Sequence, residues 1–220
     1  MILVLQWAFW VVGIGLQLLL LITLSQGLGR HFPALFAYIV CLLATTLADI
    51  LAVMALGRNS STYVTYYWSA ELVRQTVLFA LVVSLAVHVL PANRRTTAMT
   101  RVAALAGTLI WSLSVAVLYS ERLNTWMTAV VRNLSFFSGV LTLIVWFLCA
   151  RRESRDMQRL MIAGGLGLQM TGEAIGQAVR QMKISSAVTT GASIFIVLAH
   201  LLCLFVWWRA LHMDRRPEQV

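Results

Sequence analysis

Charged residues are scarce in this chain of 220 residues, which has 8 acidic and 17 basic side chains and is 11% charged. An ordinary soluble domain carries about 25%. Proline occurs only three times, so long helices need not be interrupted. The shortage of charge excludes an ordinary soluble globular domain. A mean hydropathy of +0.83 indicates instead a chain that is surrounded by lipid.

The sequence also lacks the common catalytic and metal-binding patterns. It contains no H-E-x-x-H zinc motif, no G-x-S-x-G nucleophile turn and no glycine-rich phosphate loop. Its three cysteines, Cys41, Cys149 and Cys203, lie singly in apolar stretches, with no C-x-x-C pair. We therefore expect a protein that is not an enzyme and that holds no metal.

Two cofactor classes are disfavoured by the positions of single residues. A pair of axial haem ligands needs two histidines at one depth, and His88 and His200 are offset by several residues. A retinal protein needs a lysine in its seventh helix, and the only lysine is Lys183, in a predicted loop. We expect no cofactor.

Long apolar runs dominate what is present. Each is roughly 20 residues or longer, the length that crosses about 30 Å of hydrocarbon as a helix. Short polar breaks separate the runs, so consecutive helices should be antiparallel neighbours. The sequence predicts an all-α, polytopic membrane protein, a bundle of seven transmembrane helices in a single domain over residues 1–220. The predicted spans are 2–24, 33–56, 64–90, 102–119, 125–149, 160–182 and 188–211.

The distribution of arginine and lysine predicts the orientation. Alternate loops and ends contain 11 basic residues in one set and 3 in the other; cytoplasmic loops are the ones that are rich in them. The first set is Arg30, Arg94, Arg95, Arg101, Arg151, Arg152, Arg155, Arg159, Arg209, Arg215 and Arg216, and the second is Arg58, Arg122 and Lys183. The N-terminus is then outside and the C-terminus cytoplasmic.

Aromatic residues support this orientation, because they gather at the predicted membrane surfaces. The outer group is Tyr63, Tyr66, Tyr67, Trp68 and Trp126, and the inner pair is Trp207 and Trp208. The net charge of +9 is dispersed among loops, so we expect the lipid bilayer as the partner and no nucleic acid.

Ionisable residues inside the predicted spans are the strongest functional signal, because each is costly in lipid. They are Asp49, Glu71, Arg74, Arg132, Glu173 and Arg180, and all fall in the outer half of their spans. Helical spacing places Tyr67 and Gln75 on the stripe of Glu71 and Arg74, and Gln177 on the stripe of Glu173. The candidate ligand-binding residues are Asp49, Tyr67, Glu71, Arg74, Arg132, Glu173 and Gln177.

Two interpretations of this polar layer stand side by side. It forms buried salt bridges that lock the bundle, for example Glu71 with Arg132 and Glu173 with Arg74. Alternatively, it forms an outward-facing pocket for a small polar or charged solute, for transport or sensing. Gly172 and Gly176 form a small-xxx-small pattern that allows a close helix contact.

The leading functional hypothesis is the solute-binding membrane protein. The alternative is a structural or accessory subunit that binds a partner membrane protein, and the second alternative is an intramembrane enzyme acting on lipid, with Glu173 or Asp49 as acid or base. The motif Tyr66-Tyr67-Trp68-x-x-Glu71 resembles small bacterial seven-helix membrane proteins for which no activity is known. That resemblance implies the bacterial inner membrane and no particular activity.

Overall fold

The computed structural model describes residues 2–57, 60–89, 101, 123–151, 157–182 and 185–213. These residues contain six α-helices and one short 3-10 helix, and no strand. The helices are α1 (Ile2–Ser25), η1 (Leu28–Arg30), α2 (Pro33–Leu56), α3 (Ser61–Val89), α5 (Leu123–Arg151), α6 (Met157–Gln181) and α7 (Ser186–Met213).

Six of the seven predicted helices are present, and their ends differ from the predicted ends by a few residues at most. The range 33–56 is reproduced without change as α2, whereas α3 begins three residues earlier than predicted. The predicted span 102–119 lies outside the described residues. The all-helical class is therefore confirmed.

Among the described residues, five helices are long and apolar enough to cross a membrane: α1, α2, α3, α5 and α7. Their apolar side chains also face outward, with Val11 68% exposed, Met54 73% and Phe136 68%. These helices indicate a multi-pass membrane protein. The predicted span 160–182 forms α6, which is long enough but too rich in glycine and glutamine to reach the same hydropathy.

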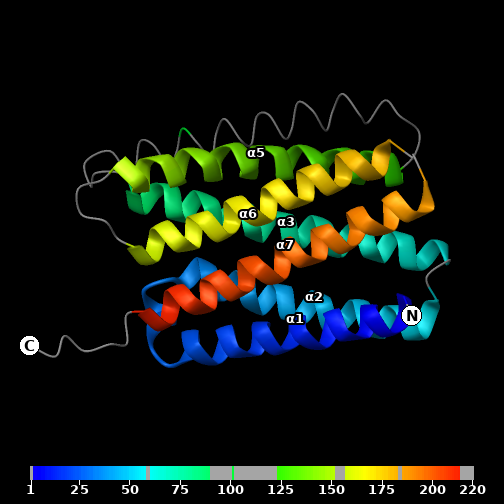
Figure 1. Ribbon diagram of the computed structural model, residues 1–220, viewed down its shortest axis with the longest axis horizontal. Helices are drawn as coiled ribbons and strands as arrows, with labels where there is room; N and C mark the ends of the chain where they lie inside the picture. The colour runs from blue at the N-terminus through cyan, green and yellow to red at the C-terminus, as the bar shows by residue number, and fades with distance from the viewer. Residues whose placement is uncertain are drawn as a thin grey trace, which may run out of the picture. The chain divides into compact units, whose positions relative to one another are not determined.

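The described chain divides into two compact units, with one boundary between Phe32 and Pro33 and the other within α5. The first unit contains α1, η1, the end of α5 from Thr142, α6 and α7. The second contains α2, α3 and the part of α5 up to Leu141. The helices of each unit can be followed by colour in Figure 1.

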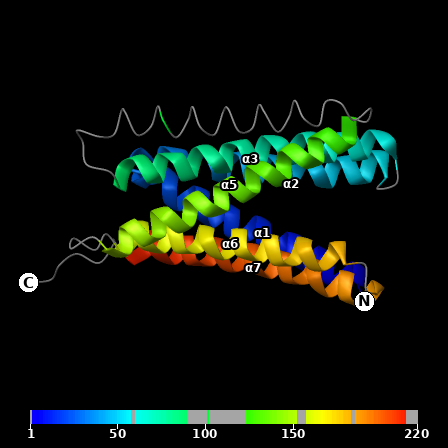
Figure 2. The same cartoon turned by 90° about the horizontal axis from the view of Figure 1, so that it is seen from above.

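The first unit is built on the α6–α7 hairpin, whose two helices lie side by side in both views (Figures 1 and 2). Ile162 and Leu166 of α6 pack in its core with Leu204 of α7. Trp207 is completely buried there, and its Nε1 donates a hydrogen bond of 2.9 Å to the Ile162 carbonyl. The interpretation of Trp207 as a membrane-surface residue is wrong, because its ring packs between α6 and α7.

Glycines on α6 allow this close approach, as the small-xxx-small pattern predicts. A Cβ at Gly165 would lie 2.8 Å from Trp207 Nε1, and one at Gly172 would collide with the Cβ of Ala199. At Gly176 a Cβ would collide with Ile196 and lie 3.2 Å from the Ala192 carbonyl oxygen. A side chain larger than hydrogen at these positions would push α7 away from α6.

The second unit contains an antiparallel hairpin of α2 and α3. Leu35, Tyr38, Ile39 and Leu42 are buried on α2, and Leu78, Leu81 and Val82 on α3. At the turn, Gly57 has a φ of 71° and donates its N–H to the Val53 carbonyl at 3.1 Å, which closes α2. The Ser60 hydroxyl then accepts the Tyr63 N–H at 3.0 Å and caps the start of α3.

We predict that Gly172→Ala destabilises the protein by about 1–3 kcal/mol, because the new methyl group meets the Cβ of Ala199, which cannot rotate away. The matched control is Gly191→Ala on α7, since a Cβ there meets nothing within 4 Å. The control should be neutral or gain about 0.5–1 kcal/mol, because alanine favours a helix. Both variants are compared by their free energy of unfolding, measured in detergent with increasing dodecyl sulfate. Equal effects of the two variants would contradict the close packing of Gly172 against α7.

Candidate functional site: the polar groups of the α2–α3 hairpin

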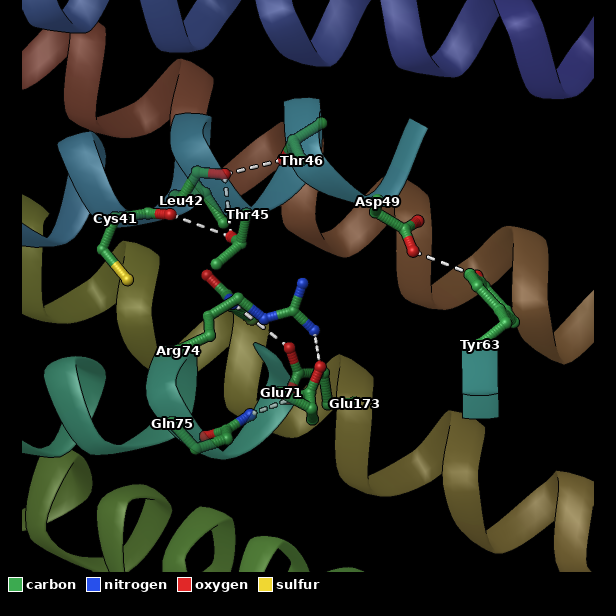
Figure 3. A network of polar contacts seen from close by, with 11 residues as sticks. Cys41, Leu42, Thr45, Thr46, Asp49, Tyr63, Glu71, Arg74, Gln75 and Glu173 are labelled. Carbon is green, nitrogen blue, oxygen red and sulfur yellow. Dashed lines mark hydrogen bonds and ion pairs between the residues drawn. The ribbon is translucent and has the colours of Figure 1, made fainter. Parts of the chain in front are cut away.

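Three polar side chains of α3 bond to one another. Arg74 forms an ion pair with Glu71 Oε2, and the Gln75 amide donates to Glu71 Oε1 at 3.1 Å (Figure 3). The three residues occupy one face because they are three and four positions apart. Both carboxylate oxygens of Glu71 are therefore bonded within one turn of helix.

These groups are partly or fully buried. The side chain of Gln75 is 2% exposed, and those of Glu71 and Arg74 are 11% and 34% exposed. A lone carboxylate would be costly in an apolar segment, and the adjacent guanidinium offsets that cost. The carboxamide oxygen of Gln75 is buried and has no hydrogen-bond partner in the part of the chain that the structure describes.

The facing stretch of α2 directs its own hydroxyl groups at its backbone. Thr45 donates to the carbonyls of Cys41 and Leu42 at 2.9 and 3.0 Å, and Thr46 donates to Leu42 at 2.8 Å. Figure 3 shows the Arg74 side chain lying beside Thr45. The hydroxyl protons of both threonines are therefore used within α2.

Asp49 lies in a second group of contacts, nearer the turn of the hairpin. Its Oδ1 accepts a hydrogen bond of 3.0 Å from the Tyr63 hydroxyl, which joins α2 to α3 (Figure 3). Tyr67, which the sequence also placed in the site, is 40% exposed, and its ring contacts those of Tyr63 and Trp68. Asp49 and Tyr67 thus belong to an aromatic group at one end of the hairpin.

In the first unit, Glu173 is half-buried on α6 and accepts a hydrogen bond of 3.1 Å from the Gln169 amide one turn earlier. Gln169 itself is buried. The backbones of Arg132 and Gln177 lie within α5 and α6, and their side chains lie outside the described residues. The proposed pair of Glu71 with Arg132 stays a prediction, and the described partner of Glu71 is Arg74.

The histidines considered for haem occupy different settings. His88 is exposed near the end of α3, with Nδ1 at 2.7 Å from the Ser84 carbonyl oxygen, and His200 is half-buried in α7. Within the described ranges, no group of three His, Cys, Asp or Glu side chains could hold a metal ion.

Sequence reasoning missed the role of Tyr63, which it read only as a membrane-surface aromatic. The available signal was the position of the turn. Asp49 and Tyr63 lie at similar distances on either side of Gly57, so an antiparallel hairpin brings them to the same level. Gln75 was placed on the correct stripe but was not included among the candidate ligands.

Comparison with protein-family models, with curated proteins and with solved structures finds no match to this chain.

We predict measurable coupling between Glu71 and Arg74. In a double-mutant cycle of Glu71→Gln and Arg74→Met, we expect a coupling energy of about 1–2 kcal/mol in the free energy of unfolding. Each single variant already loses the ion pair, so the second change costs less in its presence. The control cycle combines Glu71→Gln with Arg30→Met, an exposed residue of η1. Additive effects are expected in the control; additivity in both cycles would show that the ion pair contributes nothing.

Proposed function

We propose that this chain is a solute-binding membrane protein, in which Glu71, Arg74 and Gln75 of α3 hold a small polar or charged molecule for transport or sensing. The observation that supports the proposal is the buried Gln75 carboxamide oxygen, which has no partner among the described residues and lies near the Arg74 side chain, itself 34% exposed. A buried acceptor without a donor costs about 1–3 kcal/mol. A bound molecule that donates a hydrogen bond would remove this cost.

The three side chains suit a solute with groups of both signs. The Arg74 guanidinium has five N–H donors, of which a planar carboxylate or phosphate can take two at once. Glu71 and the Gln75 oxygen accept from an ammonium or hydroxyl group. The ion pair is nearly neutral in total, so a zwitterion or a neutral polar solute fits better than an ion of high charge.

The proposal includes a topology. The chain crosses a bacterial inner membrane seven times, with its N-terminus outside and its C-terminus in the cytoplasm, and the site opens outward. The excess of basic residues in one set of loops supports this orientation. The turn between α2 and α3 is then on the outer side, and η1 with Arg30 and His31 on the inner side.

The alternative is a structural role, as an accessory subunit of a membrane complex. One observation favours it: Glu71 already has bonds to both of its carboxylate oxygens within α3. Buried ion pairs of this kind can specify packing without binding anything.

A solute library separates the two functions. We expect a zwitterion, or another polar molecule with a hydrogen-bond donor, to raise the thermal unfolding midpoint of the purified protein, because a ligand that binds the folded state stabilises it. Gln75→Met, which keeps the side-chain length and removes the carboxamide, should abolish that increase, and so should Arg74→Met.

The control is Gln26→Met at the exposed end of α1, which should respond as the native protein does. If no solute stabilises the native protein, and Gln75→Met and Arg74→Met lower its midpoint without any ligand, the structural role is supported and solute binding is not.

The topology makes its own prediction, for a variant in which Cys41, Cys149 and Cys203 are replaced by alanine. A cysteine at the exposed position 61 should react in spheroplasts with a membrane-impermeant maleimide, because Ser61 begins α3 on the outer side. A cysteine at the exposed position 31 should react only after the membrane is disrupted. The opposite pattern would reverse the orientation.

A further inference from the structure

Asp49 lies inside a membrane-spanning helix. No residue that the structure describes balances the negative charge of its carboxylate. Its only described bond is the one it accepts from the Tyr63 hydroxyl, and it belongs to no ion pair among the described residues. Seven residues separate it from the end of α2 at Leu56, which corresponds to about 10 Å along the helix. A carboxylate at this position needs a positive partner or a proton.

Tyr63, the partner of Asp49, belongs to a group of aromatic rings at the start of α3. The ring centroid of Tyr63 lies 6.5 Å from that of Tyr66 and 6.4 Å from that of Tyr67, and Tyr67 lies 5.4 Å from Trp68 in an edge-to-face arrangement. The Tyr66 hydroxyl is buried without a hydrogen-bond partner within the described ranges. Tyr67 is 40% exposed, so part of this aromatic group is open to a ligand.

A carboxylate beside several aromatic rings is the chemistry that binds organic cations. The faces of tyrosine and tryptophan rings attract an ammonium group, most strongly when it is desolvated. Hard metal ions need six or more oxygen ligands, or octahedral geometry, and Asp49 supplies the only described carboxylate here. An alkylammonium ion needs one carboxylate and apolar walls, and this end of the hairpin offers both.

The position is separate from the ion pair of α3. Tyr63 and Glu71 are eight residues apart, which is about 12 Å along the helix. The cation would therefore bind nearer the turn than the solute proposed for Gln75.

We propose that Asp49, with Tyr63, Tyr66, Tyr67 and Trp68, forms a binding site for an alkylammonium cation. The cation is either the headgroup of a membrane lipid or a free solute, and both share the same substituted ammonium group. An aromatic membrane-surface belt alone would explain the rings but not a carboxylate beside Tyr63 whose charge no described residue balances.

The probe is tetramethylammonium chloride, titrated against sodium chloride at equal ionic strength, on the full chain in nanodiscs of phosphatidylglycerol, a lipid without an ammonium group. Thermal unfolding and tryptophan fluorescence are the two readouts. We expect tetramethylammonium, and not sodium, to raise the unfolding midpoint and to change the fluorescence in a saturable way.

Three variants test the residues. Asp49→Asn keeps an acceptor for Tyr63 but removes the charge, and it should weaken tetramethylammonium binding at least about tenfold. Tyr67→Leu should weaken it about threefold, the loss of one partly exposed ring. Thr76→Val, at an exposed position of α3 outside both proposed sites, should bind tetramethylammonium as the native protein does.

Repeating the titration in phosphatidylcholine nanodiscs identifies the source of the cation. A midpoint that is already raised, with no further response to tetramethylammonium, would assign the site to a lipid headgroup. An unchanged response would assign it to a free solute. Equal responses to sodium and tetramethylammonium would overturn the proposal. So would an Asp49→Asn protein that is less stable without any ligand and still binds tetramethylammonium with the native affinity, since Asp49 would then be a structural group.

Discussion

Hydrocarbon offers no hydrogen-bond partner, and the helices of this protein are arranged around that constraint. Backbone groups bond within each helix, and several hydroxyl groups of the spans donate to carbonyls one turn earlier. Thr23 donates to Leu19, Thr76 to Leu72 and Ser193 to Thr189, each at 2.8 or 2.9 Å. Polar residues of this kind can occupy apolar helices without a partner from another helix.

The same constraint explains why α6 differs from the other helices. Its glycines and glutamines lower its hydropathy, so contact with lipid alone would favour it less than α1 or α7. Instead, α6 contributes close packing. Gly172 and Gly176 bring its backbone against Ala199 and Ile196, and the Trp207 hydrogen bond joins the two helices at another level. In lipid, such contacts between small residues hold helices together where the hydrophobic effect does not.

The sequence predicted the helices well because hydrocarbon thickness and polar turns determine their length and ends. The range of α2 followed from its apolar run and from the polar breaks at residues 26–30 and 57–61. It predicted contacts between side chains less well, because these depend on how each helix is rotated about its axis. Trp207 is of a residue type that is common at membrane surfaces, but it is completely buried. Tyr63 was predicted to be a membrane-surface aromatic residue, but not the hydrogen-bond donor to Asp49.

Most described hydroxyl groups of the helices are bonded in this way, but the Asp49 carboxylate and the Gln75 carboxamide oxygen stand apart on the α2–α3 hairpin, where the Tyr66 hydroxyl is also buried without a described partner. A leucine or methionine at either position would pack in an apolar span without the cost of an unbalanced charge or an unpaired acceptor. Residues that break a local rule at a cost in stability are expected where a protein binds something. Both groups lie on the hairpin that carries the described ion pair of Glu71 and Arg74, so the search for a ligand belongs there and not at the tightly packed α6–α7 contact.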